Sequence, residues 1–507
     1  MKDEAATSTL KPVVDEFGVT ASNSQDKANL FANRLQRIHK EPDYRGFNNE
    51  WKEQVEQYLR DNEEAFVTKM EESYLEEEVG DNSNLVTEVK LDELEETLQK
   101  CKNRSAAGND DISYQMLKRR PLKYKETLCQ LFSYAIRLGH FPTIWKSALV
   151  KMLPKPQKDS KMAKNFRPIS LLSCVGKVLE RILAQRLSKH LEAEKLLSKT
   201  QETQNDSRTT TKGDKTTAAL FLDAESAFDR CWHIGIRYKL KKDFNLPHRT
   251  TRLLSSFLTN RTLTVNYEGC SSHVVHLLAG TPQGSPLSPL IYIMYVNDYP
   301  QSIQENCSLS QFADDTAIWT SAFTRALAIR KVQNSLNILE GWCRRWRVRL
   351  NGEKSNIYIF ISRTRDKDDE NFSLHLFDDI VRPVESAKFL GVTIDSKLSF
   401  KKHFESICNR ASKRLNVLKV LSNAGVEAPI LIRLYKCYIL SLFEYGCPSF
   451  VAASKEQMKN FQKTQNSAIR VCLSLPSYIR TSLLHEYASM ETVKERLCTL
   501  YRLYKSF

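Results

Sequence analysis

Two neighbouring aspartates, Asp314 and Asp315, lie inside the apolar stretch SLSQFADDTAIWTS. The flanks SLSQF and TAIWT are typical of strands, so the pair is expected at a tight turn between two antiparallel strands. A third carboxylate, Asp223, ends the apolar run TAALFLD, which predicts a buried strand. Alternation along a strand points Asp314 and Asp315 in different directions, so neighbouring strands would bring Asp223 and one of the pair close enough to raise each other's pKa values.

A divalent cation would remove this repulsion. Carboxylate and phosphate oxygens are the ligands that Mg²⁺ prefers, and two such ions can clamp an in-line phosphoryl transfer. One ion would activate an attacking 3′-hydroxyl while the other holds a triphosphate. A purely structural alternative also exists, because Asp-Asp is a common turn dipeptide and a strand-end aspartate can cap a following helix. The aspartates alone leave both interpretations open.

The elements that must position these residues alternate between strand and helix patterns. LVKMLPKPQKDSKMAKNFRPISLL predicts two strands joined by a basic loop, and VGKVLERILAQRLSKHL has helical apolar spacing. Polar and apolar residues alternate in TLTVNYEG and SHVVHLLAG, which predicts two strands of a β-hairpin. GTPQGSPLSPL predicts a loop that leads into a helix. The segment AESAFDRCWH is expected to be helical, whereas 199–216 has no pattern of regular structure. Together these patterns predict an α+β fold with a helical C-terminal part.

The composition favours a folded protein with a polyanionic partner. The 507 residues are 41% hydrophobic and 27% charged, and the net charge is +15. Residues 61–100 carry 14 Asp and Glu against 3 Lys, whereas 401–507 carry 17 Lys and Arg against 7 Asp and Glu. The basic C-terminal part is therefore a candidate phosphate-contacting surface. We expect an intracellular protein without a membrane span, and no signal separates nucleus from cytoplasm.

The order of the motifs resembles that of reverse transcriptases. FLDAESAFD, GTPQGSPLSPL, FADD, LNGEKSNIYIF and FLGV follow one another as in that family, after LPKPQK and NFRPISLLSCVGKVLERIL. The residues of these motifs are most similar to those of jockey-like non-LTR retrotransposons, and the similarity covers roughly residues 100–507. The resemblance implies a right-hand polymerase with fingers, palm and thumb. It divides the chain into a helical N-terminal extension (1–100), fingers and palm (101–390), and a basic helical thumb and C-terminal region (391–507).

The resemblance also implies the chemistry of the site. Asp223 and Asp314 would hold two Mg²⁺ ions, with Mn²⁺ as an alternative, and Asp315 would assist nearby. Lys354 matches the lysine that protonates the departing pyrophosphate. A solvated surface lysine is the alternative reading of Lys354.

A second set of residues would contact the incoming nucleotide. Arg167, with Lys155 or Lys158, would grip the triphosphate, because a planar guanidinium binds phosphate oxygens in pairs. Phe228 would leave no room for a 2′-hydroxyl and so select dNTPs. Gln283 would contact the template–nucleotide pair.

Other matched positions would approach the template and the primer through their backbone. Gly280 and Gly284 let the chain come close to the template–nucleotide pair. Leu390 and Gly391, within KFLGV, would grip the primer near its 3′ end. Asp229 has no clear assignment, since an exposed helix charge and a functional role fit it equally well.

The chain departs from the family pattern in two places. The usual GFR element is absent between Gln201 and the FLD strand, so the fingers element near 201–217 is expected to be shortened. No endonuclease-like segment precedes the polymerase motifs, which suggests a fragment or decayed copy of a larger mobile-element protein. The predicted function is an RNA-directed DNA polymerase that uses an RNA template, a DNA primer or target, and dNTPs. The alternative is a catalytically inactive remnant that only binds nucleic acid.

Overall fold

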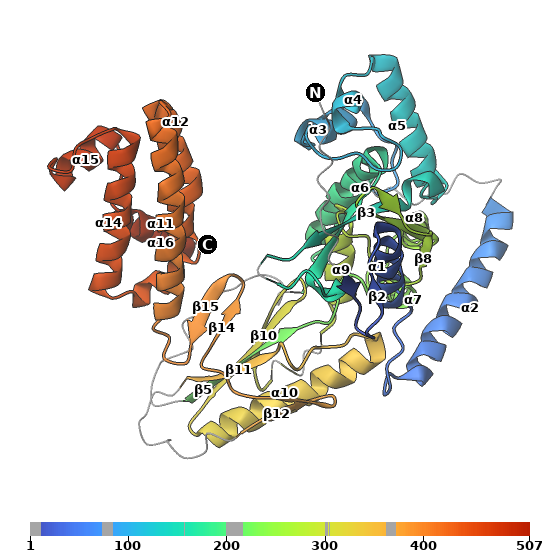
Figure 1. Ribbon diagram of the computed structural model, residues 1–507. Helices are drawn as coiled ribbons and strands as arrows, with labels where there is room; N and C mark the ends of the chain where they lie inside the picture. The colour runs from blue at the N-terminus through green and yellow to red at the C-terminus, as the bar shows by residue number, and fades with distance from the viewer. Residues whose placement is uncertain are drawn as a thin grey trace. The chain divides into compact units, whose positions relative to one another are not determined.

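The structure is a computed structural model, and Figure 1 shows its ribbon. It consists of two compact units. Unit 1 comprises Met1–Asn205, Leu222–Thr316 and Asn334–Asn351, and unit 2 comprises Asp206–Phe221, Ala317–Gln333 and Gly352–Phe507. The residues that the structure describes are 12–73, 85–156, 158–198, 216–299, 303, 305–360 and 372–506. Most of the segment expected to lack structure, 199–215, lies outside this part of the chain.

Unit 1 contains a five-stranded sheet in the order β4-β3-β6-β7, with β8 also paired to β6. The predicted strand–loop–strand is confirmed, because β3 and β4 pair antiparallel with Leu153 opposite Arg167. The predicted second hairpin is confirmed as well, since β6 pairs antiparallel with β8. The strands are β3 (Ser147–Pro154), β4 (Phe166–Leu171), β6 (Arg261–Tyr267), β7 (Cys270–Ser271) and β8 (Val275–Leu277).

The N-terminal helix α1 (Ser24–Ile38) belongs to the core of this sheet. Its buried Phe31 packs on Phe166 of β4 and Tyr267 of β6, with ring centroids 4.9 and 5.2 Å apart. The short strands β1 (Val13–Val14) and β2 (Thr20–Ala21) precede the helix. The N–H of Val14 donates to the carbonyl of Lys161 over 2.7 Å, in the basic loop between β3 and β4. The beginning of the chain therefore supports the β3–β4 hairpin.

Helices surround this sheet in unit 1. The helix α6 follows β4, and the Ser173 hydroxyl caps it by accepting from the N–H of Gly176. Its apolar face is fully buried, as the spacing predicted. Besides α1, the helices that lie wholly in unit 1 are α2 (Asn49–Ser73), α3 (Leu91–Lys100), α4 (Tyr114–Lys118), α5 (Leu122–Arg137), α6 (Cys174–Ala193), α7 (His233–Lys242), α8 (His248–Leu258) and α9 (Ser288–Tyr295).

A second sheet carries the three aspartates, in the strand order β11-β5-β10-β9. Its strands are β5 (Thr216–Asp223), β9 (Ser308–Phe312), β10 (Asp315–Ala322) and β11 (Asn356–Phe360). β5 is an inner strand of this sheet, and the run from Thr216 to Leu220 is buried throughout, so both faces of the sheet are covered here. The expected neighbouring positions of the FLD strand and the FADD strand are thereby confirmed. The amphipathic helix α10 (Arg325–Trp346) follows β10.

The segment that follows Asp223 is not helical, so this expectation was wrong. A bridge at Ala224 leads into turns over 225–229, and α7 begins only at His233. Ser226 adopts a left-handed φ of +51°, which interrupts a right-handed helix. The N–H of Glu225 is bonded to the carbonyl of Arg349, which holds the chain in extended form here. Long-range pairing therefore overrides the local helical pattern.

Unit 2 contains two small hairpins and a helical C-terminal part. The helices pack around buried aromatic rings, among them Phe404, Phe450 and Phe461, whose centroids lie 5.0–5.8 Å apart. The helix α11 lies beside α14 (Figure 1). The elements are β12 (Leu374–Leu376), β13 (Asp379–Val381), β14 (Ser386–Phe389), β15 (Val392–Asp395), α11 (Lys401–Asn423), α12 (Ala428–Tyr435), η5 (Lys436–Leu440), α13 (Ser441–Glu444), η6 (Cys447–Ala452), α14 (Lys455–Cys472), α15 (Thr481–Ala488) and α16 (Val493–Ser506).

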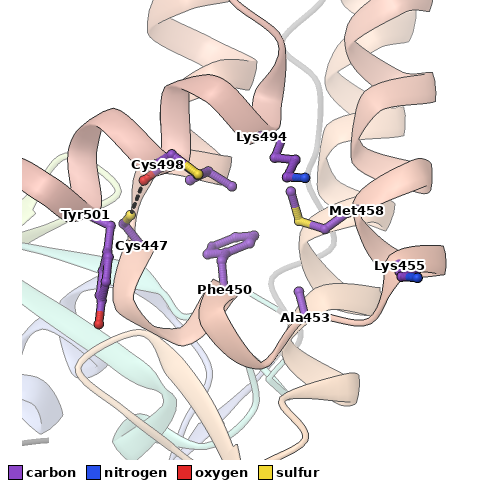
Figure 2. A pocket seen from close by; sticks show the side chains of 9 residues that line it. Cys447, Phe450, Ala453, Lys455, Met458, Lys494, Cys498 and Tyr501 are labelled. Atoms are coloured by element: carbon purple, nitrogen blue, oxygen red, sulfur yellow. Dashed lines mark hydrogen bonds between the residues drawn. The ribbon is translucent and has the colours of Figure 1, made fainter.

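A cavity of about 490 Å³ lies among η6, α14 and α16 of unit 2. Figure 2 shows Phe450 and Met458 facing this space, with Lys455 and Lys494 on the neighbouring helices. The Cys447 thiol donates to the carbonyl of Leu497, which ties η6 to α16. No helix in the described part of the chain is both long and apolar enough to cross a bilayer.

Candidate active site

The three aspartates meet at one end of the four-stranded sheet. β9 ends at Phe312, the turn passes through Ala313 and Asp314, and β10 begins at Asp315, which confirms the predicted turn. Ala313 has a left-handed φ of +54°, as tight hairpin turns require. Asp223 is the last residue of β5, the strand next to β10. All three carboxylates are half-buried.

Burial and repulsion by neighbouring carboxylates disfavour the charged forms of Asp314 and Asp315. The pKa of Asp314 is raised, first by burial and then by the charge of Asp223. The pKa of Asp315 is raised by burial and by the charges of both Asp314 and Asp223. The three side chains are thus close enough to interact electrostatically, whereas the sequence predicted only that Asp223 meets one residue of the pair.

The neighbouring chain fixes the position of Asp223. The carbonyl of Asp223 accepts the N–H of Asn351 over 2.8 Å, and Ala224 forms an antiparallel bridge with Leu350. These bonds extend the pairing of β5 beyond its last residue. The backbone on both sides of the carboxylate is therefore held.

Phe228 lies close to the carboxylates through an aromatic contact. Its ring packs against Tyr292 of α9, with centroids 4.7 Å apart and planes tilted by 37°. The charge of Asp314 is one of the influences that keep the pKa of the buried Tyr292 well above its ordinary value, after burial itself. Tyr292 thus connects Phe228 to the aspartate pair, although the sequence patterns gave Tyr292 no role.

The GTPQG loop is bonded along the segment that carries Phe228. The N–H of Gly280 donates to Cys231 over 2.9 Å, and the N–H of Thr281 donates to Phe228 over 2.7 Å. Gly280 has a φ of +88°, and a Cβ atom there would lie 2.4 Å from the carbonyl oxygen of Asp229. Only glycine fits this position, so Gly280 brings two protein segments together. This close contact is within the protein and differs from the contact with nucleic acid expected of Gly280.

A cleft of about 650 Å³ lies within unit 1, beside these loops. Lys155 and Arg167 line it from the β3–β4 hairpin, and Gln283 and Asp229 line it from the bonded loops. The structure thus brings Lys155, Arg167 and Gln283 to one cleft, as their predicted roles require. Lys158 is exposed and does not line the cleft, so the geometry favours Lys155 over Lys158. Gly284 is exposed, with a φ of +85°, near the carbonyl of Ser170.

Two features of the cleft were not assigned from the sequence. Arg34, Leu35 and Ile38 of α1 line it, although the N-terminal region was expected to be an extension outside the fingers and palm. Asp229 lines it as well, and its Oδ1 accepts the Nε2–H of Gln283 over 2.8 Å. The helical amphipathicity of α1 was visible, but its place depends on distant contacts that a local pattern does not encode.

The remaining predicted residues belong to unit 2. Lys354 is exposed and lies between Gly352 and β11. Leu390 and Gly391 form the turn between β14 and β15, with φ values of +44° and +83°. The Tyr445 hydroxyl donates to the carbonyl of Leu390, so this turn is attached to the helical part of the same unit.

The described residues contain no group of three or more His, Cys, Asp or Glu side chains arranged to hold a metal ion. A preformed all-protein cage is therefore absent from this part of the chain. Mg²⁺ is usually held by one or two carboxylates together with substrate phosphates. The donor set of Asp223 and Asp314 matches that requirement, and their repulsion is what a cation would relieve.

Comparison with known proteins agrees with this geometry. A family model described as "Reverse transcriptase (RNA-dependent DNA polymerase)" matches residues 153–394. This range contains both loops of the cleft and all three aspartates. Residues 153–394 are therefore similar to reverse transcriptase domains. The match also includes Lys354, Leu390 and Gly391.

The relatives of this chain come from mobile elements. Three Drosophila melanogaster proteins illustrate them. The "Probable RNA-directed DNA polymerase from transposon BS" is 28% identical over 96% of this chain and 54% of its own length. The "Probable RNA-directed DNA polymerase from transposon X-element" is 29% identical over 80% of this chain and 46% of its own length. The "RNA-directed DNA polymerase from mobile element jockey" is 26% identical over 82% and 47%. The chain thus spans about half the length of the curated relatives that it matches.

Similarity to solved structures is lower. A telomerase from Candida albicans, in complex with a fragment of telomeric RNA, has a TM-score of 0.38 and 12% identity over 68% of this chain and 66% of that chain. The fold observed here is a mixture of helices and sheets, as the predicted α+β class requires.

Proposed function

We propose that this chain is an RNA-directed DNA polymerase that extends a DNA primer along an RNA template. The observation that carries the proposal is the meeting of Asp223, Asp314 and Asp315 at one sheet end, in the unit that also holds a cationic cleft. The matched family and the mobile-element relatives support the same activity. In this proposal the chain has the right-hand architecture of polymerases. The β3–β4 hairpin belongs to the fingers, the four-stranded sheet to the palm and α11–α16 to the thumb.

The residues of the cleft would bind the dNTP. Arg167 on β4 and Lys155 directly after β3 offer cationic donors for triphosphate oxygens from one hairpin. Phe228 is held by its ring contact with Tyr292 and by the bond between its carbonyl and Thr281. A ring fixed in this way can exclude a 2′-hydroxyl by contact, because it has no room to move aside.

Asp223 and Asp314 would hold two Mg²⁺ ions together with the phosphates of the dNTP. When bound, the ions would supply charge stabilisation to the attacking and leaving oxygens. Asp315 begins β10 beside Asp314, and its charge would add to the negative field that draws cations to the site. Lys354 would protonate the leaving pyrophosphate, and Leu390 and Gly391 would approach the primer through their backbone.

Primer extension on a primed RNA template with dNTPs and Mg²⁺ tests the proposal. Asp314→Asn keeps the side-chain shape but removes the charge, so extension should fall about 1000-fold, the effect of several kcal/mol of lost transition-state stabilisation. Asp43→Asn is the matched control, because the Asp43 side chain is 85% exposed outside the site. The control should extend primers like the parent chain.

The alternative is an inactive remnant that binds nucleic acid through basic surfaces. Binding of the primed template is therefore measured on the same proteins at two salt concentrations. Salt-sensitive binding without extension in the parent chain would reject the polymerase and support the remnant. Equal extension by Asp314→Asn and the parent chain would reject the assigned site.

A further inference from the structure

Asp229 and Gln283 form a hydrogen-bonded pair at the wall of the nucleotide cleft. The Gln283 Nε2 lies 2.8 Å from Oδ1 of Asp229, and both residues line the cleft. A carboxylate can only accept hydrogen bonds. The amide NH₂ of Gln283 must therefore face Asp229, which leaves the amide oxygen for the cleft.

The position of Asp229 is fixed independently of this bond. Its own N–H donates to Ser226 over 2.9 Å, and its carbonyl borders Gly280, where only glycine fits. The carboxylate also has a second neighbour, the Nε2 of His39, at 3.9 Å. The His39 Nδ1 lies 3.1 Å from the carbonyl of Ala279, so Nδ1 carries a proton. Asp229 thus sits on a rigid backbone and is a firm acceptor for Gln283.

We propose that Asp229 is a positioning residue that fixes the amide of Gln283 as a hydrogen-bond acceptor toward the bound nucleotide. A flexible amide could turn either its donor or its acceptor to the ligand, and Asp229 removes that choice. An ionised triphosphate has no hydrogen-bond donor, so the group that donates to the Gln283 oxygen is a sugar hydroxyl or a base amino group. This inference rests on the proposed function, because it assumes that the ligand of the cleft is a nucleotide.

A charge-conserving exchange tests the pair. In Gln283→Glu, two carboxylates face each other, and the acceptor no longer has a fixed direction. In the double variant Asp229→Asn with Gln283→Glu, the new Asn NH₂ donates to the new carboxylate, and one carboxylate oxygen again faces the cleft. The parent pair and the exchanged pair carry the same net charge. Asp229→Asn alone still offers an acceptor to Gln283, but its NH₂ can also donate to the Gln283 oxygen, so the direction of the Gln283 amide is fixed less firmly.

We expect Gln283→Glu to lower kcat/KM for dNTPs by about tenfold or more, mainly through KM, because a buried polar pair is broken. Asp229→Asn should also lower kcat/KM, by less than Gln283→Glu does, and the double variant should recover most of the loss. A double variant as impaired as Gln283→Glu, with an unchanged melting temperature, would overturn the inference. So would a Gln283→Glu protein with parental kcat/KM.

The choice of nucleotide substrate shows whether the hydrogen-bond donor to Gln283 lies on the sugar or on the base. A defect that is equal for all four dNTPs and disappears with 2′,3′-dideoxynucleoside triphosphates assigns the sugar hydroxyl. A defect confined to nucleotides with a particular base amino group assigns the base.

A chain without extension activity would reject the proposed function and still leave the pair testable. Its readout is then the rise in melting temperature that a dNTP with Mg²⁺ produces on the complex with primed template. The inference is supported if this rise in melting temperature is lost in Gln283→Glu and recovered in the double variant. No difference among the four overturns it.

Discussion

Gly280→Ala should separate the effect of a close backbone contact from the effect of a left-handed φ. Gly280 has a φ of +88°, and its absent Cβ would lie 2.4 Å from the carbonyl oxygen of Asp229. Gly269 has nearly the same φ, +85°, but nothing lies within 4 Å of its absent Cβ. Gly269→Ala is therefore a matched control in the same unit.

The expected free energies follow from these two geometries. A left-handed φ costs alanine about 1–2 kcal/mol at either position. At Gly280 the added methyl group must also displace backbone, and overpacking of this kind costs roughly 1–3 kcal/mol. The displacement strains the bonds from Gly280 to Cys231 and from Thr281 to Phe228. Gly280→Ala should thus destabilise the protein by about 2–5 kcal/mol and Gly269→Ala by about 1–2 kcal/mol.

Urea denaturation of both variants and the parent chain measures this difference, and primer extension measures its effect on the site. The strained bonds of Gly280 hold Phe228 and lead to Gln283, so Gly280→Ala should raise KM for dNTPs by about tenfold, whereas Gly269→Ala should leave KM unchanged. Equal destabilisation by the two substitutions would refute the reasoning, since it would mean that the contact with Asp229 relaxes without cost.

Three further predictions concern single side chains. Lys155→Ala should raise KM for dNTPs about tenfold with a smaller change in kcat, whereas the exposed Lys158→Ala should leave steady-state kinetics unchanged. Burial lowers the pKa of His233 to about 4, so the free energy of unfolding should decrease by up to about 3 kcal/mol as the pH drops from about 6.5 to about 4. In His233→Gln this decrease should be smaller, as measured by denaturation at several pH values. Burial and the charge of Arg261 lower the pKa of Lys146 to about 8. Lys146→Met should therefore be at least as stable as the parent chain at pH 7, and this difference in stability should shrink between pH 8 and 10.5.

The signs of the two pH predictions follow from proton binding. The unfolded chain protonates His233 more readily than the folded protein does, so acid favours unfolding between the two pKa values. For Lys146 the unfolded chain also binds the proton more tightly, and stability therefore rises as the pH increases from about 8. A pH-independent stability in either window would contradict the burial of that side chain.

The strand pairings were predictable because they depend on patterns that a local sequence contains. Asp223 closes an unbroken apolar run, and such a run indicates a strand buried on both faces. Asp314 and Asp315 interrupt two strand-like flanks, which indicates a turn. With both strands assigned, their meeting required only that the strands be neighbours, and the sheet order places them so.

The helix predicted after Asp223 failed for a reason that also explains why the role of Asp229 was missed. The segment AESAFDRCWH has helical spacing, but its backbone bonds go to distant partners, among them Arg349 and Thr281. A helix would turn Asp229 toward solvent as an ordinary surface charge. In the observed turns, Asp229 instead faces Gln283, a residue 54 positions away.

The same argument applies to α1. Its amphipathic pattern predicts a helix with one buried face, but the pattern does not say which surface covers that face. Phe31 finds this surface on β4 and β6, which brings Arg34 and Leu35 to the cleft. Residues that act on a ligand through a distant neighbour are not identified by a motif alone, since Asp229 ends the motif FLDAESAFD and its role still stayed open. They become visible only when the donors and acceptors of the folded chain are traced one by one, because the direction of a hydrogen bond is fixed by chemistry and its partner by the fold.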